Sequence, residues 1–222
     1  MPANSTAEQL DIETYEPTRS ANLKEVETAP KKVARKGRPR STKSHQAILR
    51  ATNNLLLRMS VQELSIEAIA KKAKVGKTTI YRWWPNKTAV VMDALINQPG
   101  MQTPLPTAQN NIDAVRMQLD KLIRLLDSSN GDTIAQLFSE AQASAESKAI
   151  FENNFIGPLL DAIEYSIQQG QASGEFKDTL DSKTATDIAC GPLFFRLMAH
   201  GSDFNDTFQE TYTQDVLNLL TV

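Results

Sequence analysis

Lysine, threonine, tyrosine and arginine side chains gather between Lys77 and Arg82, in the segment KTTIYR. Lysine and arginine donate hydrogen bonds to phosphate oxygens and to the acceptor atoms of guanine, and hydroxyl groups can bond to either. A helix from Lys77 to Trp84 would bury Ile80 and Trp84 on one side. It would leave an outward face suited to nucleic acid, made of Lys77, Thr78, Tyr81 and Arg82.

A second short helix just before this segment would position it. Ser65 is a favourable N-cap, and Glu67 in the first turn complements the helix dipole. An apolar stripe at helical spacing follows, made of Ile66, Ile69, Ala70 and Ala73. The period breaks over the next three residues, where Gly76 can supply either a backbone conformation or a close approach that other residues avoid. Residues 64–87 are therefore predicted to form a helix-turn-helix, which lays its second helix in the major groove of DNA.

Two other interpretations compete with the helix-turn-helix. Gly76-Lys77-Thr78 has the ending of a phosphate-binding P-loop, but that motif needs a glycine where Lys71 stands and a strand before it. The P-loop is therefore rejected. An ordinary helical hairpin with a solvated basic face stays open on the local pattern alone.

The distribution of charge favours a polyanion as partner. The chain has 222 residues and a formal net charge of −2, and residues 1–30 hold two basic and six acidic side chains (−4). Residues 31–97 hold fifteen basic and three acidic side chains (+12), whereas residues 98–222 hold seven and seventeen (−10). The basic part is the one that contains the predicted helix-turn-helix, so the two observations together favour DNA binding.

Residues 1–40 show no periodicity and are predicted to be a disordered tail. The last ten of them, KKVARKGRPR at 31–40, form a basic arm. Gly37-Arg38-Pro39 resembles the core of an AT-hook, so Arg38 and Arg40 are candidates for a narrow minor groove, where negative potential is concentrated. An arm that only solubilises the chain or binds phosphate loosely explains the same composition.

A DNA-binding domain of four helices is predicted at residues 41–97. The first helix begins after a cap at Ser41 or Thr42 and ends near Met59, and the helix-turn-helix supplies the next two. The fourth begins at Lys87, where a cation in the first turn opposes the helix dipole. A bound phosphate would relieve that opposition, so Lys87 is a candidate clamp on the DNA backbone.

Residues 98–222 are predicted to form a larger, all-helical domain that begins at a proline- and glycine-containing break. Periodicity indicates helices at 108–126, 133–145, 148–169, 182–199 and 204–220. The helix at 182–199 is apolar on nearly all sides, which predicts burial in its own subunit or against a second chain, and Pro192 is expected to kink it. With the last helix it would form half of a four-helix dimer interface.

Other chemistries find little support in the sequence. Cys190 is the only cysteine and lies in an apolar stretch, which predicts a buried thiol and excludes an internal disulfide. His45 and His200 have no neighbours that suggest catalysis or a metal site, so we expect no enzyme, no cofactor and no metal. The sequence has no apolar run of membrane-spanning length and no signal peptide, so we expect a cytoplasmic protein.

The stretch AIAKKAKVGKTTIYRWWPNK, from Ala68 to Lys87, resembles the TetR family of bacterial transcriptional regulators. The family pattern is roughly IA-x-x-A-G-V-S-x-x-T-[LI]-Y-x-x-F-x-x-K. It is matched at Ile69, Ala70, Ala73, Val75, Thr79, Ile80, Tyr81 and Lys87. At the three departures, Lys74 replaces glycine, Gly76 replaces serine and Trp84 replaces phenylalanine. The usual serine cap of the second helix is therefore absent.

The resemblance implies an all-α homodimer whose two helix-turn-helix domains contact a palindromic operator on double-stranded DNA. By position it assigns a backbone contact to Ser65 and base or phosphate contacts to Lys77, Thr78, Thr79, Tyr81, Arg82, Trp83 and Lys87. The residues themselves leave two alternatives open, because Thr79 could cap or pack and Trp83 could shield the core. The resemblance also implies a small molecule that binds inside the C-terminal domain and weakens DNA binding, which makes the protein a repressor.

An apolar set in the C-terminal domain is the candidate lining of an effector pocket. It consists of Met117, Phe138, Phe151, Phe155, Phe194, Phe195 and Met198. Such a pocket would suit an unknown small hydrophobic molecule. Aromatic residues at helical spacing also occur simply as core, and that alternative stays open.

The favoured function is therefore a sequence-specific, DNA-binding transcriptional repressor. The alternative is a nonspecific architectural DNA-binding protein. That alternative explains the basic arm, but it does not explain a separate acidic domain of over a hundred residues.

Overall fold

Helices provide the regular structure of this protein. The computed structural model describes residues 42–98, 101, 107–201 and 204–222. Within them every element is helical, apart from one isolated bridge between Phe176 and Thr221, which confirms the all-α class. The predicted cap at Ser41 and the basic arm with Arg38 and Arg40 lie outside the described residues.

Four helices form the part of the structure that we name the head (residues 42–97). They are α1 (Thr42–Leu56), α2 (Ile66–Ala73), α3 (Lys77–Tyr81) and α4 (Lys87–Ile96). α1 stops at Leu56 rather than near Met59, because the amides of Arg58 and Met59 both turn back to the carbonyl of Leu55. Each helix contributes a fully buried side chain to a shared core, namely Ile48, Ile69, Ile80 and Val90.

The turn between α2 and α3 places its left-handed residue at Lys74, where φ is 55° and ψ is 46°. The amide of Val75 donates to the carbonyl of Ala70 at 3.0 Å, and this bond pattern needs a left-handed residue directly after the last helical one. Gly76 instead has φ −76° and ψ 148°, an ordinary extended conformation. The interpretation in which Gly76 supplies the unusual backbone is therefore wrong, since Lys74 supplies it at a steric cost to its Cβ.

α3 is shorter than the predicted helix from Lys77 to Trp84. It ends at Tyr81 because the amides of Trp83 and Trp84 both donate to the carbonyl of Ile80, at 2.9 and 3.1 Å. Ile80 and Trp84 are buried, as predicted. The N-cap position, Gly76, makes no side-chain hydrogen bond to α3, which agrees with the loss of the usual serine.

Seven helical segments form the part that we name the body (residues 107–222). They are α6 (Asn111–Leu126), α7 (Ser129–Ala141), α8 (Ala145–Phe151), the π-helical η1 (Glu152–Ile156), α9 (Gly157–Ser173), α10 (Ser182–His200) and α11 (Asp206–Leu220). α6 begins later than predicted and α7 earlier, because Asn110 and Ser128 accept hydrogen bonds from first-turn amides and so fix both starts.

The π-helical segment interrupts the long helix predicted at 148–169. The chain stays helical from Ala145 to Ser173, and the amide of Gly157 donates to the carbonyl of Glu152, five residues back. A Cβ at position 157 would lie 2.8 Å from that carbonyl oxygen, so glycine permits the wider turn. π-Helical turns of this kind occur frequently at functional sites.

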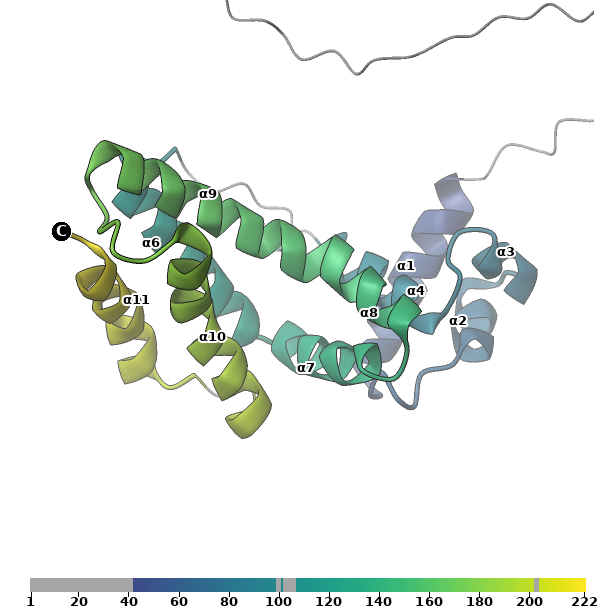
Figure 1. The fold of residues 1–222 in the computed structure, drawn as a ribbon. Helices are drawn as coiled ribbons and strands as arrows, with labels where there is room; N and C mark the ends of the chain where they lie inside the picture. Colours follow the sequence, from purple (N-terminus) through teal and green to yellow (C-terminus); the bar gives the residue numbers. More distant parts are fainter. Residues whose placement is uncertain (1–41, 99–100, 102–106, 202–203) are drawn as a thin grey trace, which may run out of the picture. The chain divides into compact units, whose positions relative to one another are not determined.

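Figure 1 shows how α4 joins the head to the body. α4 packs against α1 on one side and against α7, α8 and η1 on the other. Within the body, α9 packs against both α6 and α10, and α11 packs on α6. One continuous set of buried apolar side chains runs from Ile48 in α1 to Leu220 in α11. Head and body therefore share a core, and α4 belongs to both.

Replacing Gly76 with serine should stabilise the chain by restoring the cap of α3. The added Cβ would meet only Thr78 Oγ1, at 3.6 Å, which is an ordinary contact. A serine cap and a less flexible unfolded chain should together raise the free energy of unfolding by about 0.3–1 kcal/mol. Urea denaturation at constant protein concentration measures this change, and a fall would show that serine cannot cap α3 here.

A Lys74→Gly variant should be more stable by up to about 1 kcal/mol, because glycine adopts the left-handed conformation without strain. Lys72→Gly is the matched control, since Lys72 lies in the last turn of α2 and glycine in a regular helix costs about 1 kcal/mol. Equal destabilisation by the two substitutions in the same urea experiment would contradict the left-handed assignment of Lys74.

Candidate nucleic-acid interface

The outward face of α3 carries the polar residues that the sequence predicts there. Lys77, Thr78, Tyr81 and Arg82 are exposed, Tyr81 by 53% of its surface, whereas Thr79 and Trp83 are half-buried. Ile80, on the opposite face, is fully buried, so α3 cannot rotate without bringing an aliphatic side chain into water. The helix thus holds two cations and two hydroxyl groups outward in a fixed orientation.

An ion pair holds Lys77 toward α2. Its Nζ lies 2.8 Å from Oε1 of Glu67, and this hydrogen bond raises the pKa of Lys77 and lowers the pKa of the Glu67 carboxyl. Both side chains are more than half exposed, and ion pairs in that setting contribute little to stability. A phosphate or a guanine could therefore replace Glu67 as the partner of Lys77 at small cost.

An aromatic cluster fixes the end of α3 between α1 and α4. The ring of His45 stacks on Trp84 at 4.7 Å and meets Trp83 edge-on at 4.5 Å. Asp93 on α4 accepts a hydrogen bond from Trp84 Nε1 at 2.8 Å and lies 3.2 Å from His45 Nε2. From the sequence, His45 was weighed only as a metal ligand or catalytic residue, and its packing against Trp83 and Trp84 was not predicted. His45 stands three residues before Ile48, which lies on the buried face of α1, and this spacing could have predicted that His45 packs inward.

Two other predicted contact residues also have structural roles. Ser65 caps α2, where its Oγ accepts a hydrogen bond from the amide of Ala68 at 3.1 Å, as predicted. Trp83 packs on His45 and stays half-buried, which suits shielding of the cluster. Arg38 and Arg40 lie outside the described residues.

Lys87, which the sequence predicts as a clamp on the DNA backbone, turns toward the body. Its Nζ donates to the carbonyl of Val61 at 2.7 Å and to Oε1 of Glu140 on α7 at 2.9 Å. The side chains of Lys87 and Glu140 are 23% and 22% exposed, so water screens the pair only in part. The sequence does not reveal this partner, because Glu140 lies 53 residues further along the chain. Two of the three ammonium hydrogens of Lys87 therefore already have acceptors within the protein.

α7 and α8 fasten the head at three points. The amide of Val61 donates to Oε1 of Gln136 on α7 at 2.6 Å, so Val61 is bonded through both its amide and its carbonyl. Gln136 and Glu140 stand four residues apart and therefore share one face of α7. Asn86, the N-cap of α4, donates to Oε2 of Glu146 on α8 at 3.0 Å. The turn after α1 and the start of α4 are thus held by the body.

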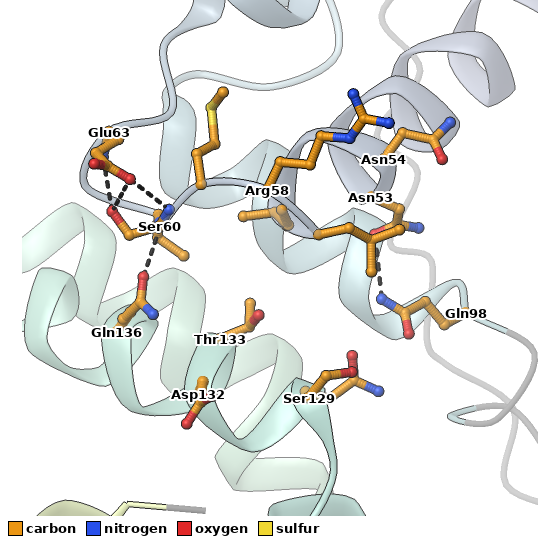
Figure 2. A pocket seen from close by; sticks show the side chains of 15 residues that line it. Asn53, Asn54, Arg58, Ser60, Glu63, Gln98, Ser129, Asp132, Thr133 and Gln136 are labelled. Carbon is orange, nitrogen blue, oxygen red and sulfur yellow. Dashed lines mark hydrogen bonds between the residues drawn. The ribbon is translucent and has the colours of Figure 1, made fainter.

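A crevice of about 700 Å³ opens beside these contacts, between the end of α1 and the start of α7 (Figure 2). Its polar lining includes Asn53, Asn54, Arg58, Ser60, Glu63, Gln98, Ser129, Asn130, Asp132, Thr133 and Gln136. Ser60 and Glu63 bond to each other on the head side, while Gln136 reaches across from α7.

The predicted effector residues do not share one cavity in the described structure. Five of them line an apolar cavity of about 230 Å³ together with Ile134 and Leu197; the five are Phe138, Phe151, Phe194, Phe195 and Met198. Phe195 and Met198 are 71% and 42% exposed, so this cavity lies at the surface. Phe155 lines a groove of about 550 Å³ between α6 and α9, and Met117 lines neither.

α10 presents an apolar stripe to the outside of this single chain. The stripe consists of Gly191, Pro192, Phe195 and Met198, which are all exposed and recur on one side of the helix. The outward residues of α11 are mostly polar, for example Glu210, Gln214 and Asn218. Of the last two helices, α10 therefore has the face that is typical of a subunit contact.

Three further observations concern chemistry away from α3. Cys190 is buried, and burial raises the pKa of its thiol to about 12, so the sulfur stays protonated and is a poor nucleophile. In the part of the chain that the structure describes, no three His, Cys, Asp or Glu side chains gather where they could hold a metal ion. Among the same residues, no helix has the length and apolar character needed to cross a membrane.

Comparison with known proteins relates both parts of the chain to one family. The family model for bacterial regulatory proteins of the tetR family matches residues 48–94, and the model for the tetracyclin repressor-like C-terminal domain matches residues 113–216. The HTH-type transcriptional regulator YdeS of Bacillus subtilis is 31% identical over 175 residues, which cover 79% of this chain and 88% of YdeS. Rv1556 of Mycobacterium tuberculosis, also an HTH-type regulator, is 27% identical over 184 residues, which cover 82% and 89% of the two chains.

Solved structures share this fold. The TetR family transcription regulator SCO0332 has a TM-score of 0.63 at 21% identity, with 79% of this chain and 97% of that chain covered. The flavonoid-responsive regulator FrrA has a TM-score of 0.56 at 18% identity, with 82% and 98% covered. These matches join the helix-turn-helix of α2 and α3 to the helical body, and the chain belongs to the TetR family of helix-turn-helix transcriptional regulators.

Proposed function

We propose that this regulator is a repressor that binds a palindromic operator as a homodimer and is released by a small-molecule effector. The observation that carries the proposal is the exposed polar face of α3, fixed on a buried core within the segment of net charge +12. Such a face supplies the phosphate contacts that give affinity and the base contacts that give sequence preference. The protein would act on chromosomal DNA in the bacterial cytoplasm.

The exposure of each side chain suggests its part in DNA binding. Arg82 is exposed and could reach guanine acceptors with two parallel hydrogen bonds, and Lys77 could reach them by exchanging Glu67 for the base. Thr78 and Tyr81 offer hydroxyl groups to phosphates or base edges. Thr79 is half-buried and is better placed to pack than to read DNA. Lys87 would join the phosphate contacts only after Glu140 releases it.

A dimer through α10 would give the operator its symmetry. Two copies that meet on the stripe of Gly191, Pro192, Phe195 and Met198 would bury apolar surface that a single chain exposes. A two-fold axis between the copies would orient two α3 helices toward successive turns of the major groove on one face of the duplex. This arrangement predicts two half-sites in inverted order.

The groove between α6 and α9 is the better candidate for the effector site. Its lining includes Ile96 at the end of α4 and Asn130 at the start of α7, and Asn130 also lines the crevice beside the head. A molecule in the groove would touch α4 of the head and α7 of the body, on which the head is held. If it favours one angle of the head over another, it changes DNA affinity by that difference. FrrA, which has a similar fold, is by its name responsive to a small molecule.

DNase footprinting on genomic fragments that the protein selects should reveal a protected palindrome. A nonspecific architectural protein would protect DNA uniformly, and that result would contradict the proposal.

The Arg82→Ala variant should lose discrimination at one base position of each half-site, by about 1–3 kcal/mol. Competition binding with a set of single-base operator variants measures this loss. Lys71→Ala, on the exposed side of α2, is the control and should leave base preference unchanged. A loss for Arg82→Ala that is equal at every operator sequence would instead place Arg82 on phosphate.

Phe195→Glu should dissociate the dimer, because it would place a charge inside the apolar stripe of α10. Sedimentation equilibrium over a range of concentrations should find a monomer. Asn218→Glu, on the polar outward face of α11, should remain dimeric. The reverse pattern would move the interface from α10 to α11.

Glu140→Gln should strengthen operator binding several-fold, because it removes the carboxylate that holds Lys87 and frees that cation for phosphate. The salt dependence of binding should steepen by about one counterion per head. Lys87→Met should weaken binding, and adding Glu140→Gln to Lys87→Met should bring no gain. If Glu140→Gln alone weakens binding, the Lys87–Glu140 pair belongs to the DNA-bound form.

A further inference from the structure

We propose that the groove between α6 and α9 binds an amphipathic organic anion, a molecule with one acid group on an apolar chain or ring system. This inference rests on the proposed effector function and adds the chemical class of the effector. It differs from the sequence-based expectation of an uncharged or purely hydrophobic molecule, because the observed groove is not the predicted aromatic cluster.

The two walls of the groove differ in chemistry. The wall from η1 and α9 is mostly apolar and presents Phe155, Pro158, Leu159, Ala162 and Ile163. The wall from α6 alternates apolar and polar residues, since Leu122 and Leu125 share it with Gln118, Lys121 and Arg124. A volume of about 550 Å³ lies within the range of sites for small organic ligands. A molecule there would lay an apolar body on α9 and direct a polar group to α6.

The positive charges in the lining of the groove favour a negatively charged group on the ligand. Among the described residues that line the groove, Lys121 and Arg124 carry charge, and none is an aspartate or glutamate. This lining contrasts with residues 98–222, whose net charge is −10. Two cations on successive turns of α6 give the groove a local positive potential within an acidic domain. A carboxylate would gain charge-assisted hydrogen bonds there, whereas an ammonium group would be repelled.

The accessibility of the two cations is compatible with exchange of a ligand. Lys121 is half-buried, and one of its hydrogen bonds goes to the carbonyl of Met101 at 3.4 Å. Arg124 is exposed at the rim of the groove. The acid group would therefore sit at the edge of the groove, near water, while the apolar body lies deeper, against Phe155 and Leu159.

Isothermal titration calorimetry on the full chain, without DNA, tests the class directly. Decanoate and 2-naphthoate are the probes, and 1-decanol and 2-naphthol are their uncharged counterparts. We expect at least one carboxylate to bind with saturation at about one molecule per chain, and about tenfold more tightly than its uncharged counterpart. Preference for decanoate identifies a chain ligand, and preference for 2-naphthoate a ring ligand. Equal affinity of acid and alcohol, or no saturable binding of either acid, overturns the proposal.

Substitutions on α6 test the site. Lys121→Met combined with Arg124→Met should weaken binding of the carboxylate about tenfold or more and change binding of the alcohol little. Arg116→Met is the matched control on the same helix, because Arg116 bonds to Gln214 on α11 and lies outside the groove. Circular dichroism and the melting temperature verify that each variant folds, and the two single variants replace the double variant if it does not. Unchanged carboxylate affinity in the folded variants overturns the proposed site.

The outcomes separate this inference from the proposed function. A protein that footprints a palindrome but binds neither carboxylate remains a regulator and overturns only the ligand class. A protein that binds decanoate through Lys121 and Arg124 but protects DNA uniformly keeps the binding site and loses the proposed function.

Discussion

The Lys87–Glu140 ion pair is the interaction on which the joint between head and body depends. Lys87 also bonds to the carbonyl of Val61, whose amide bonds to Gln136, so α7 holds the turn after α1 from two sides. Both charges are about three-quarters covered, and removing one partner would leave the other charge poorly solvated.

The orientation of α3 depends on a different set of contacts. His45, Trp84 and Asp93 tie the end of α3 to α1 and α4 entirely within the head. Because α4 also packs on α7, α8 and η1, it is the element through which a shift in the body would reach α3. Under the proposed function, residues on the outward face of α3 set base preference, and the contacts between α4 and α7 set regulation. The two properties could therefore be altered by different substitutions.

Local patterns in the sequence were enough to predict most of the fold. The cap at Ser65, the buried Ile80 and Trp84 and the outward face of α3 depend only on residues within a few turns of one another, and the structure confirms them. Long-range partners were not predictable in this way. Glu140 bonds to Lys87 although the two residues are 53 positions apart. The π-helical turn before Gly157 contains one residue more than a regular helical turn, and the spacing of apolar residues gives no sign of it. The same limit explains why the predicted aromatic pocket divides between a surface cavity and the α6–α9 groove.

The basic head and the acidic body meet at the start of α4, where carboxylates of the body bond to side chains of the head. Glu140 and Glu146 belong to the acidic body, and they bond to Lys87 and Asn86 at the start of α4, next to the proposed DNA-binding face. Under the proposed function, the carboxylate of Glu140 occupies the place at Lys87 that an operator phosphate would take. If this contact opens when DNA binds, any change that tightens the contact opposes DNA binding. A ligand that touches α4 and α7 in the groove would then act on DNA binding without contacting α3, by changing how firmly the body holds the start of α4.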